Sequence, residues 1–250
     1  MPPALATSLI ATVVSWVALP DAPTYFIPAY HTTASIICWA LIAGPIAGVV
    51  SVGYVRMIAL ADRNRPKDWL RLIAPALAFA LLGLASIWLP QLLGNGKDLA
   101  QLTFNGEVAP VLLLALLLLK PLATVMCLGS GAPGGLFTPS LTLGALLGSV
   151  LGYAWTWLWP GAPPGLFALV CAGAVIAATT QGPISAVVLM IELSGHDRSF
   201  VAPLLIAVAS ATLVARTIDS RSIYDARLTD EELAAREKLR EPPSLDSANI

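Results

Sequence analysis

The chain has 250 residues, of which 57% are hydrophobic and 12% charged, and its mean hydropathy is +0.78. This composition lies well outside the range of soluble domains and predicts an all-α, polytopic membrane protein that lies in a lipid bilayer. The formal net charge of −1, without a long basic block, argues against nucleic acid as a partner. Cys38, Cys127 and Cys171 lie in apolar runs without metal-binding spacing, so we expect small core residues, no disulfide frame and no metal site.

The first apolar runs of the chain predict membrane helices. Residues 4–19 predict a short apolar helix, and the run 33–61 is too long for one simple span. Gly44-Pro45 interrupts that run, so we expect two helices or one sharply kinked pair. Small residues at Gly44 and Gly48 would allow another helix to approach closely.

The polar segment 61–71 contains four basic residues and sets the predicted orientation in the membrane. Basic loops are concentrated on the cytoplasmic side, so we place this segment there. The following span, residues 72–89, would then lead to an external loop over 90–109. Within that loop, residues 98–104 predict a short interfacial helix.

Two long apolar runs, residues 110–128 and 140–159, each supply about the twenty residues that one membrane-spanning helix needs. Between them lies the glycine-rich segment 129–139. Lipid cannot hydrogen-bond irregular backbone, so such a segment is tolerated only inside protein or along a wet cavity. The pattern therefore indicates a pathway.

Pro139 fits the first turn of the helix after the glycine-rich segment. Leu136 and Phe137 would then present free N–H groups at the positive end of that helix, which is a common geometry for binding an anion. The simpler interpretation is a helix–loop–helix corner whose glycines only allow tight packing. Composition alone does not decide between the two.

Two charged residues lie within or near apolar helices. Lys120 is predicted either to be paired inside the bundle or to snorkel, or else to provide positive potential along an anion route. Glu192, near a helix end, is predicted to form an ion pair or a cap, with a proton relay as the alternative.

The second half of the sequence predicts discontinuous helices. Gly144, Gly148 and Gly152 recur every fourth residue and predict a helix face against which another helix packs closely. The apolar stretch 166–193 is interrupted at 179–183, giving two pieces of about a dozen residues each, too short to cross the hydrocarbon core. Interrupted segments of this kind are typical of transporters.

The C-terminal part predicts a last apolar helix over residues 200–215. Beyond it, Thr229-Asp-Glu-Glu232 resembles a capping box that starts a short soluble helix. We expect the tail from Pro242 onward to be disordered.

Three stretches carry a family resemblance. Gly129-Ser-Gly-Ala-Pro-Gly-Gly-Leu-Phe-Thr-Pro139 resembles the GxFxP selectivity-filter motif of the CLC family of chloride channels and chloride/proton exchangers. The string from Ala178 to Glu192 and the terminal Ser222-Ile-Tyr-Asp225 are similar in kind and order to the second half of CLC proteins. The resemblance extends from near the N-terminus to about Leu228.

The resemblance implies specific roles for residues of this chain. In that family each subunit has two inverted halves, with chloride held between helix ends from both. Leu136 and Phe137 would give backbone N–H groups to chloride, and Tyr224 would give its hydroxyl. The implied selectivity-filter motif is Gly135, Leu136, Phe137, Thr138 and Pro139.

The resemblance also implies an architecture. Residues 1–228 would form the C-terminal half of a CLC-type transmembrane domain, followed by a short cytoplasmic tail over 229–250. The implied protein is a multi-pass homodimer in the cell membrane, with a cytoplasmic C-terminus, chloride as the transported ligand and no cofactor.

The GSGIP-like motif and the GREGP-like motif of the family's other half are missing from the sequence. We therefore expect this chain to act only with the missing N-terminal half, and channel and exchanger activity remain equally open. One alternative is a non-conducting remnant of the same fold. Another is an intramembrane serine hydrolase, with Ser130 as nucleophile and His31 or His196 as base.

Overall fold

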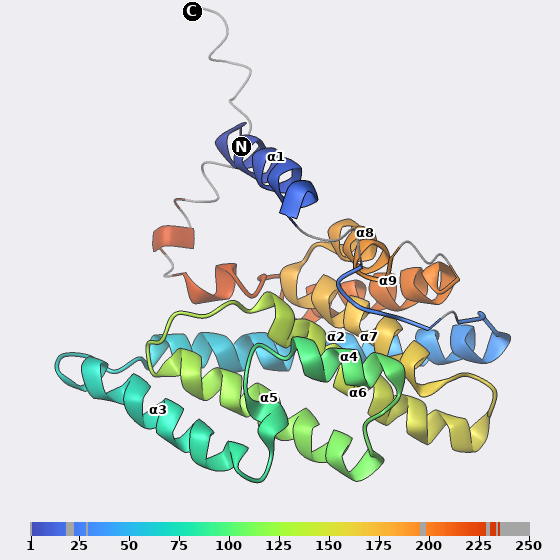
Figure 1. Ribbon diagram of the computed structural model, residues 1–250, viewed down its shortest axis with the longest axis horizontal. Coiled ribbons are helices and arrows are strands. Elements are labelled where there is room, and N and C mark those ends of the chain that lie inside the picture. Colours follow the sequence, from blue (N-terminus) through green and yellow to red (C-terminus); the bar gives the residue numbers. More distant parts are fainter. Residues whose placement is uncertain are drawn as a thin grey trace, which may run out of the picture.

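A computed structural model describes residues 2–18, 23–28, 30–195, 199–228, 231–233 and 235. All regular elements in these residues are helices, which confirms the predicted all-α class (Figure 1). The α-helices and the two 3₁₀ helices are α1 (Pro2–Ala18), α2 (Ala34–Arg63), α3 (Leu70–Ser86), η1 (Pro90–Leu92), α4 (Lys97–Asn105), α5 (Pro110–Gly129), α6 (Phe137–Leu158), α7 (Pro164–Thr180), α8 (Pro183–Leu193), α9 (Val201–Ile218) and η2 (Asp225–Arg227).

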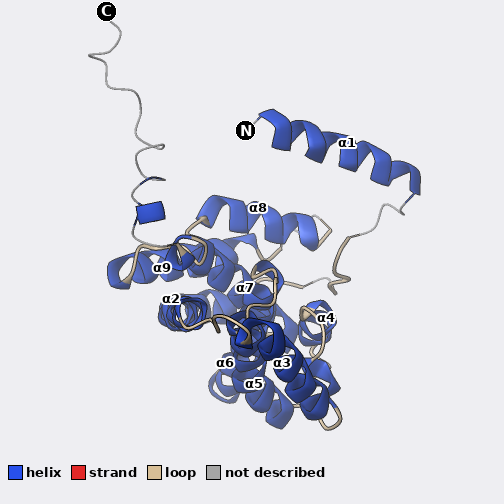
Figure 2. Cartoon of the chain, turned by 90° about the vertical axis from the view of Figure 1, so that its left-hand side faces the viewer, coloured by secondary structure: helices blue, strands red, loops and turns tan. Residues whose placement is uncertain are grey.

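Helix α7 forms the centre of the bundle. Every residue from Gly165 to Thr179 is buried, as expected for a helix that is apolar on all sides. Helices α2, α6 and α9 pack around it, and Figure 2 shows α7 between α8 and the pair α5 and α6. The short helix α4 packs against both α6 and α7 rather than lying as a detached loop.

Glycine faces bring the central helices into close contact. A side chain at Gly144 of α6 would place its Cβ 2.6 Å from the Cα of Ala172 in α7, so α7 occupies the predicted glycine face. In the same way, a Cβ at Gly48 of α2 would lie 2.6 Å from the carbonyl oxygen of Ala211 in α9. Both predicted close approaches are confirmed.

Helix α2 is continuous through Pro45, so the prediction of two separate helices at this point is wrong. Proline removes one backbone hydrogen bond, yet breaking the helix would leave several more groups unpaired. The residues around Pro45 are also held on one face, because Ala43, Gly44, Ala47 and Gly48 are all buried. Tertiary packing therefore outweighs the local effect of the proline.

The interruption between α7 and α8 is confirmed, but α7 has 17 residues rather than about a dozen, and α8 has 11. The threonines predicted to break the helix instead continue it. The hydroxyl of Thr179 donates to the carbonyl of Val175 at 2.7 Å, and that of Thr180 donates to Ile176 at 2.7 Å. The break is therefore confined to Gln181 and Gly182.

Among the described residues, four helices, α2, α5, α6 and α9, are long and apolar enough by length and composition to cross a membrane, as expected for an integral membrane protein. Helix α3 is more peripheral, with only Ala78 buried. Among the cysteines, Cys171 is buried and Cys127 half-buried, but Cys38 is exposed, so its expected place in the core is wrong. His196, Thr229, Asp230 and the tail from Pro242 lie outside the described residues.

Candidate functional site

The glycine-rich segment begins with a closed turn at the end of α5. The backbone N–H of Ser130 donates to Met126 at 3.0 Å, and that of Gly131 donates to Leu128 at 3.1 Å. Gly131 has a φ of +96°, which a side chain would strain. The carbonyl groups at the end of α5 thus find partners within the chain.

The start of α6 differs from the end of α5. Leu136 is the residue before the first helical residue, Phe137, and Pro139 lies in the first turn, as predicted. Within the described part of the chain, no group accepts a hydrogen bond from the N–H of Leu136 or Phe137. The buried Leu136 side chain, 3% exposed, anchors this end of the helix. Two adjacent donors therefore point away from the helix with their hydrogen bonds unmade.

The backbone before α6 is open to a cavity. Pro133, Gly134 and Gly135 are exposed. A cavity of about 280 Å³ lies beside them and is also lined by Lys120 and Thr124 of α5. The absence of side chains on the two glycines leaves the backbone itself as the surface of this part of the cavity.

Lys120 is paired inside the bundle, which is one of the alternatives predicted for it. Its side chain is buried, and Nζ donates to the carbonyl oxygens of Gln91, Leu92, Leu93 and Gly94 at 3.2, 2.8, 3.0 and 3.1 Å. These carbonyls come from η1 and the loop after it, 26 to 29 residues before Lys120, so no local pattern predicts the pairing. The contact fixes the loop between α3 and α4 against α5.

Tyr224 lies in a segment that is tied to the end of α7. The N–H of Ile223 donates to the carbonyl of Thr179 at 2.7 Å, and the Ser222 hydroxyl donates to the Asp225 carboxylate at 2.7 Å. Tyr224 itself is 45% exposed, and its hydroxyl bonds to no described residue. The structure therefore fixes the backbone of this segment and leaves the phenol hydroxyl available.

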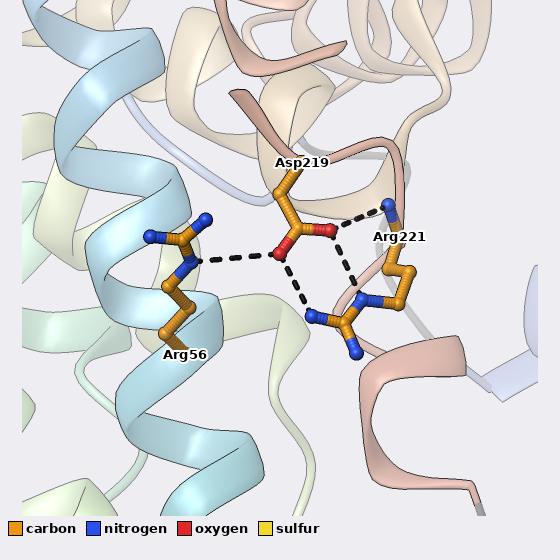
Figure 3. Close-up of polar contacts among 3 residues, drawn as sticks. All are labelled: Arg56, Asp219 and Arg221. Carbon is orange, nitrogen blue, oxygen red and sulfur yellow. Dashed lines mark hydrogen bonds and ion pairs between the residues drawn. The ribbon is translucent and has the colours of Figure 1, made fainter. Parts of the chain in front are cut away.

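A charged cluster holds the start of the same segment (Figure 3). The Asp219 carboxylate accepts hydrogen bonds from Arg221 at 2.9 and 3.0 Å and from Arg56 of α2 at 3.5 Å. The hydrogen bond from the Arg221 side chain is the main cause that lowers the pKa of Asp219 to about 2, with Arg56 adding to it. The chain leaving α9 is thus pinned to α2.

A second carboxylate, Asp62, links the glycine-rich segment with the C-terminal one. Asp62 accepts a hydrogen bond from Arg227 at 3.2 Å and pairs with Arg65 at 2.6 Å. It also lines a cavity together with Gly131. The local pattern of this basic segment indicates only its orientation in the membrane, and nothing near Asp62 in the sequence points to its contact with Arg227, 165 residues away.

The arrangement around Ser130 does not support the hydrolase alternative. The Ser130 hydroxyl donates to the carbonyl of Cys127 at 2.6 Å, as a helix-end residue does. His31 is exposed and makes no contact with Ser130 among the described residues. An activated nucleophile requires a base within hydrogen-bond reach.

Comparison with known proteins gives consistent matches. The sequence model of the family described as "Voltage gated chloride channel" matches residues 1–216. The H(+)/Cl(-) exchange transporter ClcA of Vibrio campbellii is 32% identical over 211 residues, which are 80% of this chain and 44% of the relative. The ClcA of Vibrio vulnificus is 33% identical over 197 residues, which are 75% of this chain and 42% of the relative. These relatives are transporters, not enzymes.

Solved structures show the same fold. A slow cyanobacterial Cl⁻/H⁺ antiporter superposes with a TM-score of 0.75 at 22% identity, over 93% of this chain and 54% of that one. A CLC-type fluoride/proton antiporter gives a TM-score of 0.67 at 22% identity, over 88% and 53%. The chain thus spans about half the length of the proteins that it matches. The matched family segment includes Leu136 and Phe137 and ends before Tyr224.

Proposed function

The chain belongs to the voltage-gated chloride channel family, and on this premise we propose that it forms one side of a chloride pathway through the membrane. The observation that carries the proposal is the pair of unpaired N–H groups of Leu136 and Phe137 at the start of α6. A helix N-terminus attracts anions, because its free N–H groups and the helix dipole both present positive charge.

Chloride suits this site better than a cation or a larger polar solute. The donors are backbone groups at a glycine-lined opening, so the ligand meets N–H groups without a carboxylate in the described loop. We propose that Tyr224 adds its free hydroxyl, a neutral donor that allows the ion to leave again. The motif Gly135 to Pro139 then acts as the selectivity filter.

We propose that transport is coupled to protons. The curated relatives are named H(+)/Cl(-) exchange transporters, and this favours exchange over a passive channel. The proposal is tested by recording the pH outside vesicles while chloride flows out. Proton movement against its gradient, driven by chloride, would support exchange, and chloride flux without proton movement would favour a channel.

The rest of the anion site is proposed to come from residues outside these 250. One helix end stabilises an anion by roughly 0.3 to 1 kcal/mol, up to about 2 kcal/mol when partly buried, whereas stripping water from a small anion costs far more. Residues 1–228 would supply one half of the transmembrane domain, with residues 229–250 as a cytoplasmic tail. Donors from a complementary half would surround the other side of the ion.

We also propose a homodimer in the cell membrane. The glycine face of α6 is occupied by α7, so it does not supply the contact between subunits. Helix α8 offers an apolar surface instead, since Ile184 is 80% and Val188 60% exposed. Cross-linking at α8 in detergent tests this proposal, and a purely monomeric protein would contradict it.

The function is tested by vesicle flux with the chain alone and with the chain co-expressed with the first half of the Vibrio campbellii relative. We expect chloride efflux only from the combined protein, and no potassium flux from either. Efflux from the chain alone at the rate of an intact relative would refute the need for a second half. No efflux from a combined protein that assembles would favour the alternative, a non-conducting remnant.

A further inference from the structure

The loop between α2 and α3 forms a charged pocket apart from the opening at α6. Its cavity measures about 420 Å³ and lies between the end of α2, the start of α3 and the turn after α5. In Figure 1 these three parts meet at the left side of the molecule. The lining residues are Asp62, Arg63, Arg65, Pro66, Lys67, Asp68, Arg71 and Gly131.

Positive charge exceeds negative charge in this pocket. Its lining has four basic and two acidic side chains. One of the acids, Asp62, is already engaged with Arg65 and with Arg227, a further cation outside the lining. Arg63, Lys67 and Arg71 are exposed and form no ion pair with a described residue. The cationic groups thus lack sufficient counter-charge within the described chain.

One donor of the pocket is also buried without an acceptor. The Nε of Arg65 has no hydrogen-bond partner, although Nη2 of the same side chain pairs with Asp62 at 2.6 Å. An unpaired buried N–H is costly, so a ligand that supplied an acceptor at this point would stabilise the loop. Guanidinium groups that present parallel donors match the oxygens of a phosphate better than they match a halide.

The surroundings indicate where that phosphate comes from. Trp69, the residue before α3, is 66% exposed, and Leu72, next to Arg71 in the first turn of α3, is 82% exposed. Tryptophan next to basic residues is typical of the membrane–water interface, with apolar side chains directed into lipid. A separate apolar groove of about 520 Å³ lies farther along α3, between its second half and α5, and shares no lining residue with the pocket. A phospholipid has a phosphate head for the pocket and acyl chains that can extend along α3 toward the groove.

We infer that this pocket binds the phosphate group of an anionic phospholipid at the membrane surface. The shared chemistry is a phosphate oxyanion held by guanidinium and ammonium groups, and a soluble phosphate would offer the same oxygens. The apolar groove and exposed Trp69 favour the lipid as the source. This site lies at the α2–α3 loop and along α3, apart from the proposed chloride pathway.

The test uses the full chain, delipidated in detergent, and native mass spectrometry. Phosphatidylglycerol and phosphatidylcholine with identical acyl chains are added at equal concentrations. The test variant combines Arg63→Gln, Lys67→Gln and Arg71→Gln, all at exposed positions, and leaves Arg65 in place for its contact with Asp62. The matched control is Lys97→Gln, an exposed lysine at the start of α4.

We expect the unmodified chain and Lys97→Gln to retain phosphatidylglycerol and not phosphatidylcholine. The triple variant should bind it at least tenfold more weakly, since each basic group near a membrane surface contributes about a fivefold effect and three such groups are removed. Equal retention by the triple variant and the control would overturn the inference, provided circular dichroism shows that both are folded. Equal retention of the two lipids would also overturn it.

A parallel measurement uses inorganic phosphate in place of lipid and records the thermal unfolding temperature. We expect millimolar phosphate to produce a smaller upward shift than phosphatidylglycerol, and this shift should be absent in the triple variant. A shift with phosphate but none with phosphatidylglycerol would overturn the lipid as the ligand.

Discussion

The two interruptions of the helical bundle, one between α5 and α6 and the other between α7 and α8, share a glycine and proline signature but differ in how their backbone is satisfied. At the second, Arg216 of α9 donates to the side chain of Gln181 at 3.0 Å and to its carbonyl at 3.3 Å. Ile223 adds a bond to Thr179. Hydrogen bonds from α9 and from the segment after it therefore pair the polar groups around this two-residue interruption.

The interruption between α5 and α6 extends from Ser130 to Leu136, and no described residue clamps it in this way. After the turn at Gly131, no described group pairs with the backbone N–H groups that lead into α6. The start of α8 also has unpaired N–H groups, but Pro183 occupies its first position and Ile184 is 80% exposed. Glycine and proline occur at both of these breaks, although α2 continues through Gly44-Pro45. Long-range partners then decide whether a break is closed or open.

The largest expected effect comes from separating α6 and α7, which connect the two interruptions. We expect Gly148→Ala to destabilise the fold by about 3 kcal/mol, because the new Cβ would lie 2.9 Å from the Cα of Ala168 and overlap the carbonyl of Phe167. Thermal unfolding in detergent measures this. Gly83→Ala is the control, since nothing lies within 4 Å of its Cβ, and a slight gain in stability is expected there. Similar effects of both changes would contradict the close packing.

The next effect tests the open backbone at α6. Phe137→Pro removes an N–H at the first helical position, and we expect roughly 10- to 100-fold weaker chloride binding by the assembled transporter. The chloride affinity is measured by calorimetric titration. Phe137→Ala keeps the N–H and should retain most of the affinity. Ile184→Pro, the same change in the first turn of α8, should leave chloride binding unaltered, and a loss there would remove the distinction between the two breaks.

A smaller effect is expected at the closed interruption. Arg216→Gln loses the paired contacts with Gln181, and we expect a destabilisation of about 1 kcal/mol with no change in chloride affinity. Hydrogen exchange should rise around residues 178–186. Arg216→Lys serves as the control for charge, because it retains the charge but not the two-pronged geometry. A change in chloride affinity for Arg216→Gln would show that this break also contributes to the pathway.

The smallest effect concerns pH. The pKa of Asp219 lies below its usual value of 3.8, at about 2, so its contribution to stability is fully present above about pH 4 and is lost as the pH falls toward 2. We expect Asp219→Asn to lower stability by about 0.5 to 1 kcal/mol, equally at pH 7 and pH 5. Unfolding temperatures at the two values measure this. If the two proteins, the unmodified chain and Asp219→Asn, already unfold at the same temperature at pH 5, the contacts of Asp219 with Arg221 and Arg56 are contradicted.

The sequence could predict the open site because its signals are local. A glycine-rich segment, two flanking apolar runs and Pro139 are sufficient to place Leu136 and Phe137 at the start of a helix. The glycine faces of α2 and α6 were predictable for the same reason, since a spacing of four residues marks one side of a helix.

The errors arose where distant residues decide the structure. Packing of Gly44 and Gly48 against α9 keeps α2 continuous through Pro45, and nothing near Pro45 in the sequence indicates that partner. Cys38 lies in an apolar run but on the outer side of α2, where no other described helix covers it. The clamp of Arg216 on Gln181 joins residues 35 positions apart and was likewise outside the reach of local patterns.

Lys120 has a consequence for how the chain enters the membrane. A lysine near the middle of α5 opposes insertion by about 2.5 to 3.5 kcal/mol, and the many leucines around it offset this. Its four carbonyl partners belong to residues 91–94, which are made earlier and must still be nearby when α5 inserts. Replacing Lys120 by leucine should ease insertion, yet it would leave those carbonyls without their donor and weaken the folded protein. The Lys120 side chain thus opposes membrane insertion but stabilises the folded protein. The carbonyl groups of the loop before α4 take the place of water around its ammonium group.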